Sequence, residues 1–194
     1  MKDILIELFE NPIKTKLIKL FLRNPQSGHS LNDLIKKLKI RKKEDAVLQI
    51  KKLERIKLIS KINSRGMAQM WQLNDDFVFL DELSSLIAKA VPISNEILVK
   101  KFKLIKGIKV VIIGGIFLNS KNKRVDLFLV GDGVDEKLLK KVISDLEADL
   151  GKEIDYVLLS SEDFIYRRRM FDRFIEDIFE KPHREIINKL SQEG

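Results

Sequence analysis

Basic side chains are concentrated in the N-terminal part of this sequence. Residues 1–74 hold 17 Lys and Arg against 7 Asp and Glu, a net charge of +10, whereas residues 75–194 carry a net charge of −2. Basic side chains at this density attract a polyanion such as nucleic acid. The alternative is a solvated lysine-rich surface, which charge alone does not exclude. The uneven charge favours a polyanion-binding segment joined to a nearly neutral one.

Within the basic segment, the charges gather on one predicted helix and on the turn before it. At about 100° per residue, the basic positions of this helix fall opposite the apolar positions Ala46, Ile50 and Leu53. Lysines and arginines there would contact DNA phosphates and give salt-dependent affinity, and Gln49 and Arg55 are expected to add contacts to bases. The predicted DNA-binding residues are Arg41, Lys42, Lys43, Gln49, Lys51, Lys52, Arg55, Lys61 and Arg65.

The elements that must position these residues follow the order of a helix-turn-helix with a hairpin. One helix begins at Asn11-Pro12, a second is capped by Ser30, and the basic helix is the third. Residues 58–62 and 68–73 are predicted strands around a cluster of turn residues. This order predicts a winged helix-turn-helix over residues 1–74, in which the third helix meets the major groove.

Composition excludes several kinds of chemistry. The chain has no cysteine, which rules out disulfides, thiolate zinc sites and cysteine nucleophiles. His29 and His183 are too few for a histidine-based metal site and are expected to be ordinary surface or turn residues. No apolar run approaches the roughly 18–20 residues that span a bilayer, and the N-terminus lacks a signal-peptide pattern. We therefore expect a cytoplasmic protein with no membrane partner, no metal and no cofactor.

The segment from residue 75 to residue 92 is predicted to be a connecting helix. Its apolar residues, from Phe77 to Ile87, recur at helical spacing, and Pro92 ends the pattern. Such a stripe either closes a core or pairs with a second copy of the chain. Winged-helix proteins often dimerise because DNA half-sites are repeated. Both interpretations stay open from the sequence.

Residues 93–194 are predicted to form a second, mixed-sheet domain. Strands are expected at 109–113, 125–130 and 154–159, and a helix at 134–150. A helix from Ser94 or Asn95 to about Ile105 precedes these elements, and a helix starting at Ser161 completes the order α-β-β-α-β-α. A final short helix is expected after Pro182. The predicted fold class is α+β.

The loop between the first two of these strands begins with Gly114-Gly115, and the next strand carries an acid, Asp126, expected to point inward. This half resembles the small nucleotidyltransferase-fold domains, the minimal members of the polymerase-β-like superfamily. Their signature is Gly-Ser after the first strand, Asp-x-Asp on the second and a third acid on a later strand. In that family, the three carboxylates hold two divalent cations that bridge the nucleotide phosphates.

The chain departs from this signature at two of its positions. Gly114-Gly115 stands in place of Gly-Ser, and Arg124-Val125-Asp126 stands in place of Asp-x-Asp, while Asp155 matches the third acid. An arginine at the first acid position would repel Mg²⁺ and is expected to pair with Asp126 or Asp155. The resemblance therefore implies an inactive copy of the nucleotidyltransferase site.

Further shared features extend the resemblance over nearly the whole chain. Winged-helix regulators of the ArsR/MarR-like type that are fused to this domain are similar in the segment 77–87, spelled FVFLDELSSLI here. They are also similar in a tail with Glu162-Asp163-Phe164, arginines and Pro182 through Ile187. The arginine run 167–169 is open to two interpretations, a phosphate-binding site or a solvated helix face.

The leading hypothesis is a sequence-specific transcriptional regulator with an inactive nucleotidyltransferase-like domain for dimerisation or sensing. Its expected partners are double-stranded DNA, a second copy of the chain, and a nucleotide or protein effector. One alternative is an active nucleotidyltransferase that uses the winged helix to find its substrate. Another is an antitoxin-like module that binds a protein partner.

Overall fold

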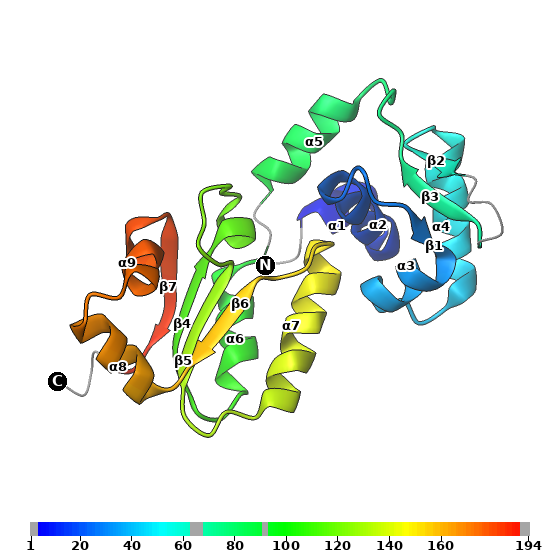
Figure 1. The fold of residues 1–194 in the computed structure, drawn as a ribbon. Helices are drawn as coiled ribbons and strands as arrows, with labels where there is room; N and C mark the ends of the chain where they lie inside the picture. Colours follow the sequence, from blue (N-terminus) through cyan, green and yellow to red (C-terminus); the bar gives the residue numbers. More distant parts are fainter. Residues whose placement is uncertain (1–3, 63–67, 91–92, 191–194) are drawn as a thin grey trace. The chain divides into compact units, whose positions relative to one another are not determined.

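The computed structural model describes residues 4–62, 68–90 and 93–190 and has an α+β fold with two small sheets (Figure 1). Two compact units are present. Unit 1 comprises residues 1–90 and 145–153, and unit 2 comprises residues 91–144 and 154–194. The predicted mixture of helices and short strands is confirmed. The finer division into domains at 75–92 stays a prediction.

Unit 1 consists of helices around a three-stranded antiparallel sheet of order β1-β3-β2. In chain order its elements are α1 (Ile4–Phe9), α2 (Pro12–Arg23), β1 (His29–Ser30), α3 (Leu31–Leu38), α4 (Lys43–Arg55), β2 (Ile59–Ile62), β3 (Met70–Leu73) and α5 (Leu80–Lys89).

Helix starts in unit 1 follow the predicted capping residues. The Asn11 side chain accepts a hydrogen bond from the Lys14 N–H at 2.8 Å, and Pro12 occupies the first turn of α2. Ser30 and Asp33 form a reciprocal capping box at the start of α3. Both predicted helix starts are confirmed. Side chains of several elements then meet in one core, which includes Leu17, Phe21, Leu34, Leu38, Ala46, Ile50, Leu53, Leu58 and Leu73.

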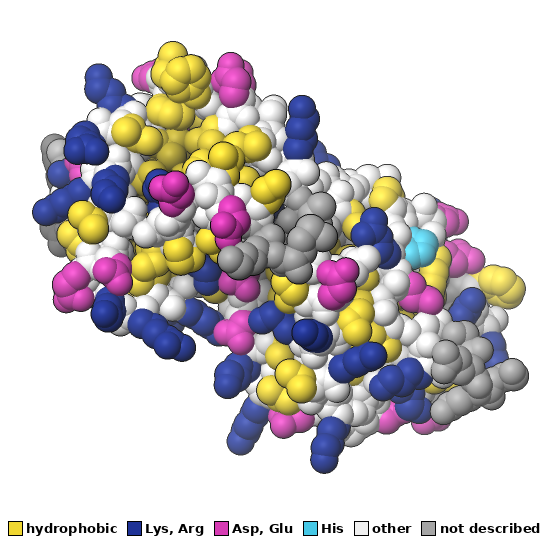
Figure 2. All heavy atoms as spheres, turned by 180° about the vertical axis from the view of Figure 1, so that it is seen from behind, with side chains coloured by type: hydrophobic (Ala, Val, Ile, Leu, Met, Phe, Trp, Pro, Cys, Tyr) yellow, Lys and Arg dark blue, Asp and Glu magenta, His cyan; other side chains and the backbone are white. Residues whose placement is uncertain are grey.

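The connecting helix closes this core. Ile87 of α5 is buried in it, and Phe77, Leu80 and Leu83 pack against it. Val78, Phe79 and Leu86 remain exposed, and Figure 2 shows apolar side chains gathered over this part of unit 1. One of the two interpretations of the stripe, closure of a core, is thereby confirmed. Pairing with a second copy stays a prediction that the exposed side chains leave open.

His29 differs from the expected surface or turn position. The ring is buried and lies edge-on to the ring of Phe21, with 5.7 Å between centroids. Burial, with a smaller contribution from the charge of Lys37, lowers the pKa of His29 below its ordinary value of 6.5. The side chain is thus a neutral part of the unit 1 core at physiological pH. His183 is exposed, as expected.

Unit 2 is built on a four-stranded mixed sheet of order β6-β5-β4-β7, in which β5 and β6 are parallel and the other pairs antiparallel. Helices α8 and α9 cover one face of it, where Phe164, Ile175 and Ile178 pack against sheet residues. The elements are α6 (Asn95–Lys103), β4 (Ile108–Gly114), the 3₁₀ helix η1 (Gly115–Leu118), β5 (Leu127–Gly131), α7 (Glu136–Leu150, whose end belongs to unit 1), β6 (Tyr156–Leu159), α8 (Ser161–Arg169), α9 (Arg173–Glu180) and β7 (His183–Asn188).

Two predictions for the end of the chain are wrong. The segment after Pro182 forms strand β7 rather than a helix, because it pairs antiparallel with the free edge of β4. The helix expected from Ser161 onward is two helices, α8 and α9, broken at Met170 to Asp172, where Phe171 has a positive φ of 53°. Pairing with a distant strand overrides the local pattern in the first case.

Candidate functional site

Six basic side chains of unit 1 form an open surface on and before α4. All six are exposed, and no side-chain hydrogen bond or ion pair is found for them within the described ranges. Leu48, which is 50% exposed, lies on the same side of the helix. We call this group the α4 basic surface; its members are Arg41, Lys42, Lys43, Lys51, Lys52 and Arg55.

The other three residues predicted to bind DNA have different outcomes. Gln49 is only 4% exposed, so the expectation that it contacts bases is wrong: it is one of the buried residues of α4, with Ala46 and Leu53. Lys61 is exposed on β2, but its Nζ is 2.8 Å from Glu54 Oε1, in an ion pair. Arg65 lies outside the described residues.

Two acids in the first turn of α4 modify the charge of the α4 basic surface. Glu44 and Asp45 are exposed, and at this position they stabilise the helix by interacting with its N-terminal dipole. Negative charge at the start of the helix leaves the positive charge in two places, the turn at 41–43 and the C-terminal half of α4.

In unit 2, Asp126 forms the centre of the predicted nucleotidyltransferase-like site. It lies directly before β5 and is 3% exposed, so the prediction that this acid points inward is confirmed. Its Oδ1 accepts a hydrogen bond from the Ile116 N–H at 2.8 Å. Its Oδ2 accepts hydrogen bonds from Lys123 Nζ at 2.6 Å and from the Asp155 N–H at 3.1 Å. A buried carboxylate is stable only when it is paired in this way.

The glycine pair allows this arrangement. Gly115 has a positive φ of 44°, and a Cβ atom there would overlap Asp126 Oδ1 and crowd the Lys123 side chain. The Gly114 N–H donates to the Asp126 carbonyl oxygen at 2.9 Å. Glycine at position 115 is therefore required by the approach of the Asp126 carboxylate to the backbone of η1. This gives the pair a structural role that does not involve a phosphate.

Arg124 does not pair with Asp126 or Asp155, so that expectation is wrong. Its Nε is 3.8 Å from Asp177 Oδ2, and its guanidinium carbon lies 5.0 Å from the centroid of the Phe174 ring. The cation beside the two acids is Lys123, whose Nζ is 2.6 Å from Asp126 Oδ2 and 3.7 Å from Asp155 Oδ2.

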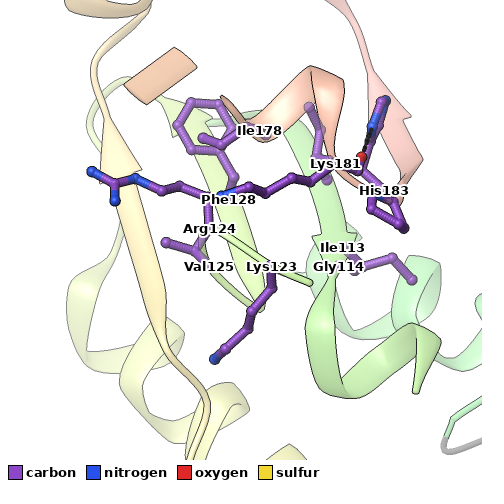
Figure 3. Close-up of a pocket in the computed structure, with 11 residues that line it drawn as sticks. Ile113, Gly114, Lys123, Arg124, Val125, Phe128, Ile178, Lys181 and His183 are labelled. Atoms are coloured by element: carbon purple, nitrogen blue, oxygen red, sulfur yellow. Dashed lines mark hydrogen bonds between the residues drawn. The ribbon is translucent and has the colours of Figure 1, made fainter. Parts of the chain in front are cut away.

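The side chains of Lys123 and Arg124 point in different directions from the loop that carries them (Figure 3). Neighbouring side chains of an extended segment point to opposite sides, so aligning motif positions does not show which cation reaches the acids. The Lys at position 123, one residue before the aligned motif, is the only signal in the sequence that could have indicated this pairing. The Lys123 side chain is long enough to contact Asp126, three residues later in the chain.

The pair of divalent cations implied by the family does not fit these residues. Both oxygens of Asp126 are engaged by Lys123 and two backbone N–H groups, and the residue at the first acid position faces Asp177. Over the described residues, no three His, Cys, Asp or Glu side chains come together as they would around a metal. A cavity beside Lys123 and Arg124 measures about 10 Å³, room for about one water molecule.

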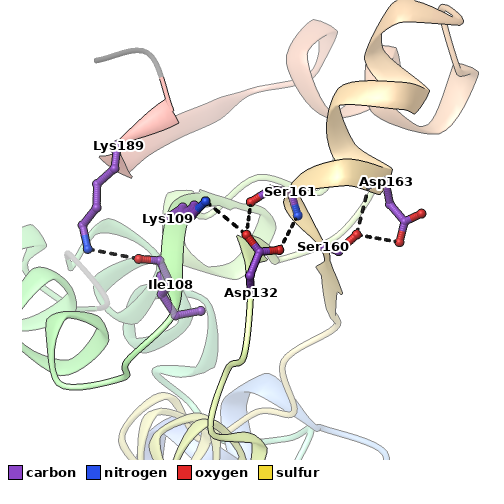
Figure 4. Close-up of polar contacts among 7 residues, drawn as sticks. All are labelled: Ile108, Lys109, Asp132, Ser160, Ser161, Asp163 and Lys189. Carbon is purple, nitrogen blue, oxygen red and sulfur yellow. Dashed lines mark hydrogen bonds and ion pairs between the residues drawn. The ribbon is translucent and has the colours of Figure 1, made fainter. Parts of the chain in front are cut away.

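A second acid cluster has a structural role at the opposite end of β5. Asp132 accepts hydrogen bonds from Ser161 Oγ at 2.6 Å and Ser161 N–H at 2.9 Å, and its Oδ2 is 3.1 Å from Lys109 Nζ (Figure 4). These contacts, the Ser161 hydrogen bonds first, lower the pKa of Asp132 to about 2. The cluster ties the end of β5 to the start of α8 and lies apart from Asp126.

Comparison of the chain with protein-family models, curated proteins and solved structures yields no significant match in any of the three. Among the helices that the structure describes, none combines the length and hydrophobicity needed to cross a bilayer. The α4 basic surface and the Asp126 cluster are the two features of the described residues that bear on function.

Proposed function

We propose that this protein is a DNA-binding transcriptional regulator whose second half is an inactive nucleotidyltransferase-like domain. The α4 basic surface is the observation that carries the proposal. From α2 onward the elements are a helix (α2), a short strand (β1), a helix (α3), a turn, a helix (α4) and two strands (β2 and β3), which is the order of a winged helix. The α4 basic surface lies on the third of these helices. A 13-residue helix that carries four exposed cations, with two more directly before it, matches the width and charge of a DNA major groove.

The exposed residues suggest how the contacts divide. Arg41, Lys42 and Lys43 precede or begin α4 and would bind phosphates at one edge of the groove, while Lys51 and Lys52 would bind them farther along. Arg55 and Leu48 would contact the bases. Arg55 can donate hydrogen bonds to guanine, and Leu48 can pack on a thymine methyl group. Gln49 contributes to the core instead.

The state of Asp126 supports the inactive half of the proposal. The Asp126 carboxylate already accepts hydrogen bonds from Lys123 and two backbone N–H groups, and Mg²⁺ bound there would lie against the Lys123 ammonium group, which repels it. In this proposal unit 2 serves dimerisation or the sensing of a nucleotide or protein effector. Incubation with labelled ATP and Mg²⁺ should transfer no label to protein or nucleic acid. Transfer that disappears in Asp126→Ala would establish an active enzyme instead.

Fluorescence anisotropy with a labelled duplex tests the DNA-binding proposal. Binding should weaken steeply between 50 and 200 mM salt, because neutralising phosphates releases counterions. The double variant Lys51→Gln/Lys52→Gln should bind about tenfold or more weakly and should reduce the salt slope by about two.

The matched control is Lys100→Gln/Lys103→Gln, which removes two exposed lysines from α6 of unit 2 and changes the net charge equally. The control should bind duplex DNA nearly as well as the unmodified chain. Equal weakening in both double variants would show attraction by net charge rather than by the α4 basic surface. Absence of binding at 50 mM salt would overturn the proposal altogether.

A further inference from the structure

Unit 2 contains a cavity that the proposed function does not use. Its volume is about 500 Å³, within the range of about 300–1,000 Å³ typical of small-molecule sites. Residues from both sheet and helices line it. Val110 comes from β4, Phe164 and Arg168 from α8, and Phe179 from α9. The cavity adjoins the first part of β4, whereas the Asp126 cluster lies beyond the last residue of that strand.

Arg168 is held in this cavity by aromatic rings rather than by an acid. Its guanidinium carbon lies 5.5 Å from the centroid of the Phe179 ring and 6.0 Å from that of the Phe164 ring. Rings in these positions hold the guanidinium by cation–π attraction without occupying its N–H donors. In the described part of the chain, no ion pair or hydrogen bond to an acid is found for this guanidinium.

The charges around the cavity are not balanced. Arg169 also lines it and likewise has no acid partner among the residues described, while Glu185 of β7 is the one acid in the lining. Arg167, the neighbour on the same helix, is outside the lining and lies 3.8 Å from Asp172 Oδ2 through its Nη1. Two arginines, for which the described residues supply no acid partner, thus lie beside the apolar side chains of the lining.

We propose that this cavity binds a small organic anion, a carboxylate or phosphate attached to a flat apolar body. The anionic group would be held by the Arg168 and Arg169 guanidinium groups, whose planar donors match such oxygens in pairs. The flat body would pack on Phe179, Ile165 and Leu190, the apolar side chains of the lining that are not fully buried, beside the Arg168 guanidinium. This site does not depend on DNA binding, because all of its residues belong to unit 2.

Methyl NMR on the full chain tests the site with a defined probe. With isoleucine, leucine and valine methyl groups labelled, 2-naphthoate should shift the signals of Val110 and Ile165 in a saturable manner. The neutral analogue 2-naphthylmethanol should bind at least tenfold more weakly, because it lacks the anion. A parallel titration with 2-naphthyl phosphate separates a preference for phosphate from one for carboxylate.

Arginine variants locate the anion. Arg168→Gln and Arg169→Gln should each weaken naphthoate binding at least fivefold, whereas Arg167→Gln, the control on the same helix, should change it less than twofold. The proposal is overturned if neither anion gives a saturable shift of the lining methyl groups, if the neutral analogue binds equally well, or if Arg167→Gln has the same effect. Duplex binding, measured on the same samples, reports separately on the proposed function.

Discussion

Charged side chains have opposite environments in the α4 basic surface of unit 1 and in the Asp126 cluster of unit 2. The lysines and arginines of α4 are exposed, and no partner is found for their side chains within the described residues. Asp126 is buried, and each of its oxygens accepts hydrogen bonds from the chain itself. The first arrangement leaves charge available to a ligand, whereas the second uses charge to hold the fold together.

This difference shows that a function should be assigned to the residues of a sequence motif only after their contacts in the structure are known. Asp126 and Asp155 match two acids of a catalytic signature by position, yet the Asp126 carboxylate already accepts hydrogen bonds from Lys123 and two backbone N–H groups. The α4 basic surface matches no such signature, but its side chains have the freedom that binding requires. Variants that remove charge should therefore affect folding at the Asp126 cluster and ligand binding at the α4 basic surface.

The largest effect on stability is expected from Asp126→Asn. Removing the charge breaks the ion pair with Lys123 and turns an amide NH₂ toward a backbone N–H or the lysine, which should lower the free energy of unfolding by about 3–5 kcal/mol. Asp155→Asn is the control, because that side chain is 59% exposed, and it should cost within about 0.5 kcal/mol. Urea denaturation measures both. Equal costs would contradict a structural role for the Asp126 carboxylate.

A smaller loss is expected from Gly115→Ala. The added Cβ would overlap Asp126 Oδ1 in a backbone conformation that disfavours alanine, so the cost should be about 2–4 kcal/mol. Gly133 also has a positive φ, of 59°, but a Cβ there would meet nothing within 4 Å. Gly133→Ala should therefore show the backbone cost alone, about 1–2 kcal/mol. If the two variants unfold at the same urea concentration, the close approach of Asp126 contributes nothing.

In unit 1, the buried His29 should make stability depend on pH. Because its pKa is lower in the folded than in the unfolded chain, stability is fully present above about pH 6.5 and falls as the pH drops through the folded-state pKa. The slope cannot exceed about 1.4 kcal/mol per pH unit for one proton. Trp71, the only tryptophan in the chain and the partner of His29 across β1 and β3, reports the unfolding by fluorescence. His29→Phe should reduce the dependence between pH 7 and pH 5, and an unchanged slope would rule out this cause.

The smallest effect on stability is expected from Lys51→Gln/Lys52→Gln. Both side chains are exposed, so the free energy of unfolding should change by less than about 0.5 kcal/mol although DNA binding weakens about tenfold or more. Urea denaturation of the same samples used for anisotropy checks this directly. A marked destabilisation would mean that these lysines support the fold, and the contrast with Asp126 would disappear.

Local signals predicted much of the fold. Asn11, Pro12 and Ser30 marked helix starts correctly because a cap acts within three or four residues of itself. Strand β7 was missed because its stability comes from the edge of β4, about 70 residues earlier. The break between α8 and α9 was also missed, since Phe171 adopts a positive φ that phenylalanine rarely takes.

For the candidate sites, the sequence predicted which residue types are present better than it predicted where their side chains point. Six of the nine residues expected to bind DNA form the α4 basic surface, because helical periodicity separates its exposed positions from its buried ones. Gln49 is the exception within the helix, since the width of the buried stripe depends on what packs against it. Arg124 was expected to pair with Asp126 or Asp155, but Lys123 is the cation beside them, because a side chain's partner depends on the path of the loop.

The sequence by itself determined the charge asymmetry, the helix starts, the spacing of the apolar positions and the departure from a catalytic signature. These properties depend on residue type and on neighbours a few positions away. Only the tertiary structure decided that Lys123 neutralises Asp126, that Gly115 makes room for the carboxylate, and that Arg168 faces a cavity. Each of these depends on groups that the fold brings together from distant positions, such as the Asp155 N–H that reaches Asp126 across 29 residues.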